Sequence, residues 1–328
     1  MIISKTPYRI SFFGGGSDYP DWYLKYGGQV LSTTIDKHIY ITCRYLPPFF
    51  KHKHRIVWSK LERVKTTNQI KHDSVRELLK MLKINKGMEI HYDGDLPARS
   101  GMGSSSCFVV GLIKTLSFLK GINISKEVLA KKSIYFEQKI LNEVVGSQDQ
   151  IAAAYGGFNK ITFLPNGNFK VKPIKLINLK GNKFNENFIL LYTGIKRTAQ
   201  HIAKSYVKKL SNSRKNEIDR IVEFVKEGED LLKSKNYDSF GKLLHESWLR
   251  KKSLSSKITN SSIDDIYDKA IKKGALGGKL LGAGGGGFLL LYVPKFKQKN
   301  FLKNFNKLVH IPFDFENTGS KIIFKHNY

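Results

Sequence analysis

A glycine- and serine-rich segment, LPARSGMGSSS at positions 96–106, lies between an expected strand and an expected helix. Glycines let backbone N–H groups approach an anion closely, and a helix N-terminus attracts negative charge through its free N–H groups and its dipole. The serine hydroxyls can donate hydrogen bonds or bind Mg²⁺. The segment therefore predicts a phosphate-binding loop, and the simpler alternative is a tight turn with a serine cap.

Two more glycine-rich loops can contribute to the same site. Segment 279–287, KLLGAGGGG, formally contains Gly-x-Gly-x-x-Gly, but a strand follows it instead of a helix, so it does not match a dinucleotide-binding fingerprint. It is either a turn for close packing or a backbone surface that contacts a phosphate loop or the substrate. Segment 13–18 ends in Asp18, which can cap a helix or accept hydrogen bonds from substrate hydroxyls. The chain has no Walker A motif and no protein-kinase signature.

Hydrophobic patterns predict the elements that position these loops. Runs rich in β-branched and aromatic residues predict strands, with a turn at Thr6-Pro7 after the first; they lie at 2–5, 30–35, 38–43, 55–59, 88–92, 188–192, 288–293 and 321–324. Helical periodicity and capping residues predict helices at 75–82, 106–120, from the Ser125 cap to about 145, and at 148–155, 199–234, 240–254 and 263–273. Because strands and helices are clustered, the fold class is α+β, with a domain change near residue 180.

Composition narrows the class of protein further. The 328 residues suggest about two domains, and 41% apolar with 25% charged residues excludes wholesale disorder. We expect no membrane span, no signal peptide and, with only two cysteines, no disulfide scaffold; a reduced, cytoplasmic enzyme is the default class.

The formal net charge of +29 is unusual, and it raises the alternative of a basic nucleic-acid-binding module. The excess comes from 46 Lys and only 10 Arg, and the two halves cut at residue 178 carry +14 and +15. Because no arm or arginine-rich stripe is formed, we favour a lysine-biased composition that attracts anionic substrates as a by-product.

Three motifs occur in an order that resembles the GHMP small-molecule kinase superfamily. They are TPYRI at 6–10 running to GSDY at 16–19, then Pro97 with GMGSSS at 101–106, then Lys279 with GAGGG at 282–286. GGGSD at 14–18, GSQDQ at 146–150 and YTGIKR at 192–197 resemble most the branch that acts on D-glycero-D-manno-heptose 7-phosphate. The departures are Met102 for the usual Leu, Ser106 for the usual Ala, and the bulky pair Arg99-Ser100.

The resemblance implies a fold and a reaction. It implies an N-terminal ribosomal-protein-S5-domain-2-like αβ domain (1–180), a C-terminal ferredoxin-like αβ domain (181–328) and an active site in the cleft between them. It implies transfer of a phosphoryl group from ATP, with Mg²⁺, to the anomeric hydroxyl of the heptose 7-phosphate, giving the 1,7-bisphosphate for nucleotide-activated heptose synthesis. Open alternatives are another acceptor, namely a fucose- or galactose-type sugar or a mevalonate-type acid. We expect a sugar-phosphate partner and neither nucleic acid nor membrane, and leave a homo-oligomer open.

Residue roles follow from the same resemblance. Asp149 matches the general base and Arg9 the cation beside the reacting hydroxyl; the alternatives are a helix cap and a surface strand charge. Ser104 and Glu137 match the Mg²⁺ ligands, although Glu137 alone reads as a solvated helix charge. The resemblance places ATP on Gly101, Met102, Gly103, Ser104, Ser105 and Ser106 with the third glycine loop at Gly284, Gly285 and Gly286, and the substrate on Gly15, Gly16, Ser17, Asp18, Gln148 and Arg197. Lys196 and Lys37 are candidate helpers of Arg197 at the substrate phosphate.

Overall fold

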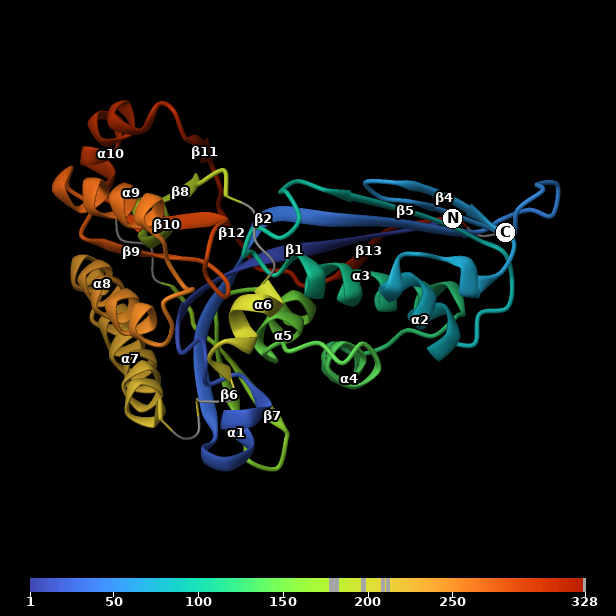
Figure 1. Cartoon of the computed structure of the whole chain (residues 1–328), viewed down its shortest axis with the longest axis horizontal. Helices are drawn as coiled ribbons and strands as arrows, with labels where there is room; N and C mark the ends of the chain where they lie inside the picture. The colour runs from blue at the N-terminus through green and yellow to red at the C-terminus, as the bar shows by residue number, and fades with distance from the viewer. Residues whose placement is uncertain (177–182, 196–198, 208–209, 211–212, 327–328) are drawn as a thin grey trace.

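A computed structural model of the chain describes residues 1–176, 183–195, 199–207, 210 and 213–326. It contains a long twisted sheet with helices beneath it and a smaller sheet packed with its own helices (Figure 1). Aromatic side chains join the two parts: the ring of Phe240 lies 5.4 Å from that of Phe12 and 4.9 Å from that of Phe184. The two domains therefore share one continuous hydrophobic core.

The first sheet is built around two long antiparallel strands. In the described residues it has nine strands: β1 (Ile2–Phe13), β2 (Gly28–Tyr45), β3 (His54–Val57), β4 (Leu61–Val64), β5 (Met88–Gly94), β6 (Asn159–Phe163), β7 (Phe169–Pro173), β12 (Phe315–Glu316) and β13 (Lys321–Lys325). Its main order is β13-β1-β2-β5-β3-β4, and β6 and β12 pair with other stretches of β2. Only β3 and β5 pair in parallel among these strands.

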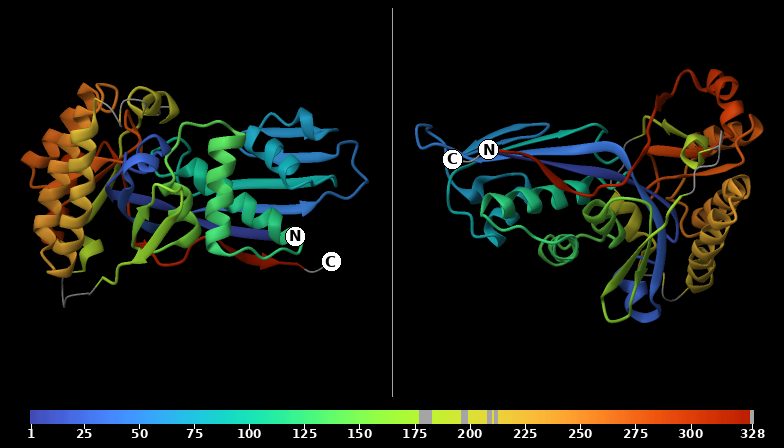
Figure 2. Two further views of the ribbon diagram at one scale, coloured as in Figure 1. Left: turned by 90° about the horizontal axis from the view of Figure 1, so that it is seen from below. Right: turned by 180° about the vertical axis from the view of Figure 1, so that it is seen from behind.

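Helices cover one face of this sheet, as Figure 2 shows from two further sides. They are α2 (Asp73–Met81), α3 (Ser104–Leu119), α4 (Lys126–Tyr135), continued by the π-helical turn η2 (Phe136–Ile140), and α5 (Gln148–Tyr155). Helix α3 is almost entirely buried, and Gly111 lets it approach β1, since a Cβ there would lie 2.8 Å from Thr6 Oγ1. Helix α3 packs against β1 and β2, and this packing fixes its N-terminus at the wall of the cavity described below.

The second sheet is antiparallel, with order β11-β8-β10-β9. Its strands are β8 (Phe188–Tyr192), β9 (Gly277–Leu280), β10 (Phe288–Tyr292) and β11 (Val309–Ile311). The helices of this part are α6 (Ala199–Lys204), α7 (Lys215–Lys233), α8 (Tyr237–Ser253), α9 (Ser261–Lys272) and α10 (Lys295–Leu302). Helix α1 (Pro20–Tyr26) and the short turns η1 (Thr67–Gln69), η3 (Phe184–Asn187) and η5 (Lys303–Phe305) complete the described elements. The predicted two-domain α+β fold is confirmed.

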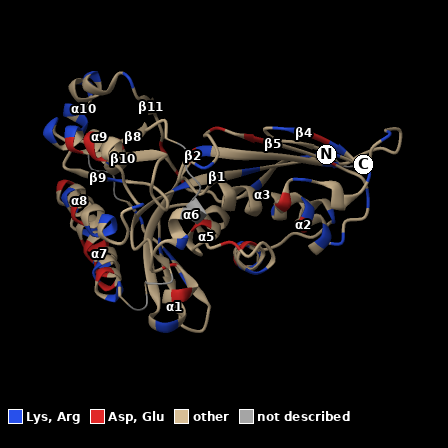
Figure 3. Ribbon diagram, viewed as in Figure 1, with Lys and Arg blue, Asp and Glu red and all other residues tan. Residues whose placement is uncertain are grey.

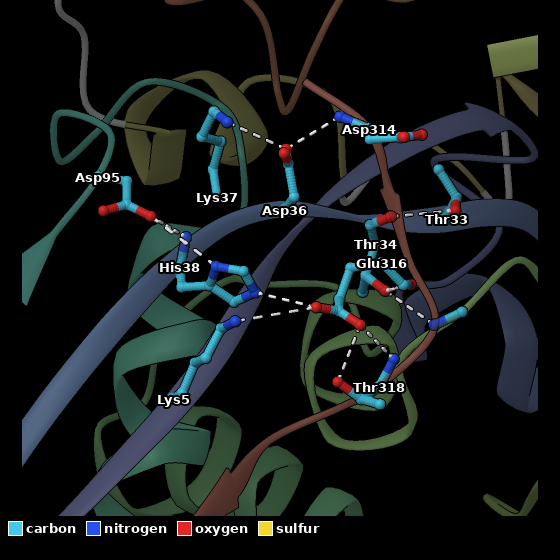
Figure 4. A network of polar contacts seen from close by, with 11 residues as sticks. Lys5, Thr33, Thr34, Asp36, Lys37, His38, Asp95, Asp314, Glu316 and Thr318 are labelled. Carbon is cyan, nitrogen blue, oxygen red and sulfur yellow. Dashed lines mark hydrogen bonds and ion pairs between the residues drawn. The ribbon is translucent and has the colours of Figure 1, made fainter. Parts of the chain in front are cut away.

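The chain returns to the first sheet at its C-terminal end. Strand β12 pairs with β2 and β13 pairs with β1. Figure 4 shows the polar contacts that hold β12: Thr34 Oγ1 donates to the Glu316 carbonyl over 2.7 Å, and Glu316 Oε2 lies 3.4 Å from His38 Nε2 and 4.0 Å from Lys5 Nζ. The first sheet therefore contains segments from both halves of the chain, and a single cut near residue 180 does not describe it.

Several predicted elements have different limits in the structure. The expected turn at Thr6-Pro7 is wrong: β1 runs through it, and the register against β2 shifts between Pro7 and Arg9, which accommodates the proline without a ladder hydrogen bond. The strands expected at 30–35 and 38–43 are one strand, and the helix expected to reach 145 ends at Ile140. Among its described residues, the segment 199–234 forms the separate helices α6 and α7 instead of one continuous helix.

Charged residues are distributed over both domains (Figure 3). Basic and acidic residues are interspersed along α7 and α8, and within α7 the pairs Lys215–Asp219 and Lys233–Asp230 form, with N–O distances of 2.6 and 3.2 Å. Among the helices of the described residues, none combines the length and apolar character needed to cross a bilayer.

Candidate active site

A cavity of about 430 Å³ lies where the three glycine-rich loops meet. The first domain lines it with Arg9, Gly15, Gly16, Asp18, Arg99, Gly101, Gly103, Ser104, Ser105, Ser106, Gln148 and Asp149, among others. The second domain contributes Lys251, Lys279, Gly282, Gly284 and Gly286 together with apolar residues. Residues far apart in the sequence thus surround one space between the domains.

In chain order, the glycine-rich loops are the first at 13–18, the second at 96–106 and the third at 279–287. The second and third loops touch through their backbones. Gly101 and Gly282 both have positive φ angles, +83° and +72°, which favour glycine. A Cβ on Gly282 would lie 2.6 Å from Gly101 Cα, so no larger residue fits without a shift. The Phe288 N–H, directly after the third loop, donates to the Ser100 carbonyl over 3.2 Å. Segment 279–287 is therefore both a turn for close packing and a backbone surface that contacts the serine-rich loop.

Arg9 and Asp149 form a two-pronged ion pair at the cavity wall. Arg9 Nε and Nη2 donate to the two carboxylate oxygens of Asp149 over 2.7 and 2.8 Å. Arg9 Nη1 donates to the Gly101 carbonyl over 2.7 Å, and the side chain is 4% exposed, so Arg9 is not a surface strand charge. Gly103 leaves room for the pair, because a Cβ there would lie 3.2 Å from Asp149 Oδ2. This pair orients a carboxylate beside the phosphate loop, where it can accept a proton.

The first glycine loop presents Asp18 to the cavity. Its Oδ1 accepts a hydrogen bond from the Gly16 N–H over 2.9 Å, and burial, with Asp149 nearby, raises the pKa of this carboxyl. Gly146 packs directly against the carboxylate, and Gln148 lines the same cavity. Ser17 differs from the prediction: its hydroxyl is fully buried and lies 2.8 and 2.9 Å from the Gly14 and Gln29 carbonyl oxygens, to either of which it can donate its one proton, so it holds the loop instead of facing the cavity.

The serine-rich loop opens helix α3 with its three serines in the first turn. Ser104 Oγ accepts a hydrogen bond from the Arg99 N–H over 3.3 Å, Ser105 is exposed, and Ser106 is buried. Met102 lies in the core, and only its backbone carbonyl, which accepts from the Arg9 N–H over 3.3 Å, belongs to the site. The loop therefore offers free N–H groups and two hydroxyls to an anion at the helix N-terminus.

Glu137 is completely buried in the π-helical turn η2, so the alternative of a solvated helix charge is wrong. Its Oε2 accepts hydrogen bonds from Ser106 Oγ over 2.8 Å and from Gln150 Nε2. Its Oε1 has no hydrogen-bond partner in the described structure. Burial raises the pKa of this carboxyl to about 8, and the charge of Glu143 contributes. Ser106, where the resemblance gave Ser104, is the serine that contacts Glu137.

Two buried lysines complete the cavity and were missed by sequence reasoning. Lys251 Nζ donates to the carbonyls of Leu280, over 3.4 Å, and Gly282, and Lys279 Nζ donates to the Phe12 carbonyl over 2.6 Å. Lys279 begins the third glycine segment and was therefore findable. Lys251 sits in the run Arg250-Lys251-Lys252, which gives no sign that its middle residue faces inward.

Other predicted residues lie elsewhere. Arg197 and Lys196 fall outside the described residues. Lys37 does not line the cavity; its Nζ lies 3.0 Å from Asp36 Oδ1. In the third loop Gly284 and Gly286 line the cavity, whereas the Gly285 N–H donates to the Ile258 carbonyl over 2.7 Å and holds the loop against the residues after α8.

Comparison with known proteins gives matches along the chain. Residues 68–157 match the family model described as GHMP kinases N terminal domain, and residues 229–310 match that described as GHMP kinases C terminal. The D-glycero-alpha-D-manno-heptose 7-phosphate kinase of Campylobacter jejuni is 30% identical, over 93% of this chain and 93% of that protein. The galactokinase of Pyrococcus furiosus is 26% identical, over 91% of this chain and 90% of that protein.

Solved structures share the fold. A D-glycero-D-manno-heptose 1-phosphate kinase from Bacteroides thetaiotaomicron superposes with a TM-score of 0.81, covering 100% of both chains at 22% identity. A sugar kinase structure from Campylobacter jejuni gives a TM-score of 0.73 at 27% identity, covering 98% of this chain and 97% of that one.

Proposed function

We propose, because this chain belongs to the GHMP kinase family, that it transfers the γ-phosphoryl group of ATP to the anomeric hydroxyl of a heptose 7-phosphate. That it is a sugar kinase, a phosphotransferase with an alcohol acceptor, follows from the family and from the heptose phosphate kinase relative. The single observation that carries the mechanism is the Arg9–Asp149 pair at the contact of the glycine loops.

The chemistry assigned to this pair is simple. Asp149 accepts the proton of the acceptor hydroxyl as its oxygen attacks the γ-phosphorus, and the bond to the departing ADP breaks. Arg9 holds the Asp149 carboxylate in place and stabilises negative charge on the phosphoryl oxygens. The serine-rich loop positions the phosphates of ATP, and Asp18 with Gln148 orients the sugar hydroxyls.

Mg²⁺ is part of this proposal, and Glu137 fits it. Its carboxylate is buried and its Oε1 has no hydrogen-bond partner among the described residues, so this oxygen is available as a ligand for a cation. Glu137 would hold the ion together with a serine hydroxyl of the phosphate loop, and a bound Mg²⁺ would neutralise charge on the nucleotide phosphates. Mg²⁺ is commonly bound by one or two carboxylates plus substrate phosphates, which suits a site with a single buried glutamate.

Glu137→Gln should change the pH dependence of stability in metal-free protein. The folded-state pKa of Glu137 is about 8, above its ordinary value of 4.5. Unfolding then releases a proton between these values, so wild-type stability falls as the pH rises from about 4.5 to about 8, whereas glutamine does not titrate. Relative to wild type, the variant should gain roughly 3 kcal/mol between pH 5 and pH 8, since each unit of pKa shift corresponds to about 1.4 kcal/mol.

The measurement is chemical or thermal unfolding of both proteins in a chelator at the two pH values. Mg²⁺ with ATP should then stabilise the wild type more than the variant, because the variant lacks the anionic ligand. A stability difference that stays constant with pH would show that Glu137 is not the buried carboxyl described here.

The acceptor is assigned by similarity and by charge. The Campylobacter jejuni relative is named for a heptose 7-phosphate, and the cavity lining has four cationic side chains against three carboxylates, which suits an anionic acceptor. The galactokinase relative keeps a neutral sugar as the second candidate. We place residues 1–180 on the nucleotide side and 181–328 on the side of the third glycine loop, with β12 and β13 assigned to the first sheet.

An ADP-release screen tests the proposed acceptor directly. The purified chain would be given ATP and Mg²⁺ with heptose 7-phosphate, free heptose, galactose, fucose or mevalonate, and ADP formation would be followed. The proposal expects turnover with the heptose 7-phosphate well above that with the others. Preference for a free sugar moves the enzyme to the neutral-sugar candidate, and preference for mevalonate rejects the sugar assignment.

Arg197→Ala tests the binding of the acceptor's own phosphate. A charge-assisted hydrogen bond is worth about 1.5–3 kcal/mol, so the KM for heptose 7-phosphate should rise roughly 10- to 100-fold, with little change in the KM for ATP. Free heptose should be used equally by both proteins. Equal losses on the two acceptors would remove Arg197 from the phosphate site.

A further inference from the structure

We propose that Lys251 binds the phosphoryl group while it passes from ATP to the acceptor, opposite Arg9 in the cavity. The inference rests on the proposed phosphoryl transfer and adds to it a residue from the second domain. It assigns to α8 a direct part in the reaction, beyond support of the third glycine loop.

Lys251 is a buried residue at the wall of the cavity. It lies in the last turn of α8, is 9% exposed and lines the cavity. Its ammonium group donates to the Leu280 and Gly282 carbonyls at the start of the third loop. An ammonium group has three N–H donors, and these two contacts leave one for a ligand.

The charges around Lys251 favour an anionic ligand. Within the described residues, no carboxylate lies within 4.0 Å of its Nζ or of Lys279 Nζ. The groups that face it are Arg9 and Lys279, which repel it, and Asp18 and Asp149, which attract it. Asp149 is already engaged by Arg9, and burial favours the neutral form of Asp18. A buried ammonium without a carboxylate in contact is costly, and an anionic ligand would offset that cost.

The neighbours of Lys251 indicate which anion it binds. Arg9 contacts the Gly101 carbonyl and Lys251 contacts the Gly282 carbonyl, and these two glycines touch each other. The two cations therefore flank the junction of the phosphate loops beside Asp149, where the reacting hydroxyl would lie. A phosphate at the far end of a seven-carbon sugar is separated from that hydroxyl by several bonds, so the group between the cations is the one being transferred.

The step leaves the lysine unchanged. The bond between the γ-phosphorus and the ADP oxygen breaks, the bond to the acceptor oxygen forms, and the acceptor proton moves to Asp149. Lys251 donates a hydrogen bond to a phosphoryl oxygen throughout and transfers no proton. Negative charge develops on the phosphoryl group between the ADP oxygen and the acceptor oxygen, and a cation fixed beside it stabilises that charge.

Three variants separate charge, hydrogen bonding and a control. Lys251→Met removes both the charge and the donor, and Lys251→Gln removes the charge but keeps an N–H donor for the loop carbonyls. Lys252→Met is the matched control on the next residue, whose Nζ lies 3.2 Å from Asp264 Oδ1 of α9 and which does not line the cavity. We expect both Lys251 variants to lose roughly 10- to 100-fold in kcat with little change in the KM for ATP, and the control to match wild type.

Binding of ADP with aluminium fluoride and Mg²⁺ tests the anion site without turnover. Aluminium fluoride mimics the phosphoryl group during transfer. The Lys251 variants should therefore bind the ADP–aluminium fluoride complex more weakly by a similar factor, while ADP alone binds as in wild type. Equal loss of ADP and fluoride binding, or a glutamine variant that behaves like wild type, would make Lys251 a structural support of the loop and overturn the proposal. A wild type that binds the fluoride complex but phosphorylates no acceptor contradicts the proposed function alone.

The pH profile gives a readout that a structural role would not change. Burial and Arg9 lower the pKa of Lys251 to about 8, against the opposing effects of Asp18 and Asp149. Wild-type kcat/KM should therefore fall as the pH rises through about 8, because the free enzyme loses this charge. Lys251→Arg, which stays protonated, should move that fall to higher pH. An unchanged profile in the arginine variant would contradict the proposal even if the other variants fail to fold.

Discussion

Asp149→Asn should lower kcat by about 10²- to 10⁴-fold while ATP binding persists, since loss of a general base typically costs that much in rate. Asparagine keeps an oxygen that can accept from Arg9, so the surroundings of the loop should be preserved, but it cannot take the proton of the acceptor hydroxyl. The measurement is steady-state kinetics together with the affinity for ATP in the absence of acceptor.

The alternative role of Asp149 is that of an acid in the first turn of helix α5. Asp264→Asn is the matched control, because Asp264 lies in the first turn of α9, accepts from Thr259 Oγ1 over 3.0 Å, and is not among the cavity residues. This control should alter stability slightly and leave kcat as in wild type. If Asp149→Asn behaves in the same way as the control, Asp149 is a helix-terminal residue and the base must be sought elsewhere.

Gly282→Ala should reduce kcat/KM by about 100-fold or more. A Cβ there would lie 2.6 Å from Gly101 Cα, so the second and third loops must move apart, and displacements of about 1 Å at a phosphoryl-transfer site cost on the order of 10²-fold. Kinetics and thermal unfolding should both be measured, because the positive φ angle adds strain of about 1–2 kcal/mol.

Gly121→Ala separates this strain from the loop contact. Gly121 has nearly the same backbone angle, φ +78°, but no atom lies within 4 Å of the position a Cβ would take. This variant should lose stability by a similar amount for the backbone while kcat/KM stays close to that of wild type. Equal kinetic losses in the two variants would mean that the contact between Gly282 and Gly101 does not matter for turnover.

Local chemistry explains what the sequence could predict. The phosphate loop needs only a strand, two glycines and a helix start, all within a dozen residues, and the structure places Gly101 to Ser106 at the N-terminus of α3. Helix α5 at Gln148–Tyr155 and strand β8 at Phe188–Tyr192 have the limits that their patterns predict, because each is bounded by glycine or by a change of periodicity. The roles proposed for Asp149, Arg9 and Glu137 depend on the order of the motifs and on the family resemblance. The residues alone left other roles open.

Long-range packing explains what the sequence could not predict. Lys251 is one of three consecutive basic residues at a helix end, a pattern typical of a solvated terminus, and the third glycine loop that its ammonium group contacts lies about 30 residues later. The family resemblance assigned Ser17 to the substrate, but β2 supplies the Gln29 carbonyl that turns its hydroxyl inward. In both cases, the direction in which the side chain points is set by a residue distant in the chain, so the local sequence could not predict it.

The return of β12 and β13 to the first sheet has a consequence for synthesis. Thr6 and Ser320 share a hydrogen bond of 2.8 Å although 314 positions separate them, and Ile2 pairs with Lys325. The flank of β1 at Ile2–Lys5 stays unpaired until residues 321–325 have been synthesised, whereas Arg9 lies further along β1 and outside this pairing. Closing contacts of such long separation is slow, and an unpaired strand edge favours aggregation in the interval. The first sheet is therefore completed only after residues 321–325 have been synthesised, and shielding of this edge of β1 by chaperones would limit aggregation until then.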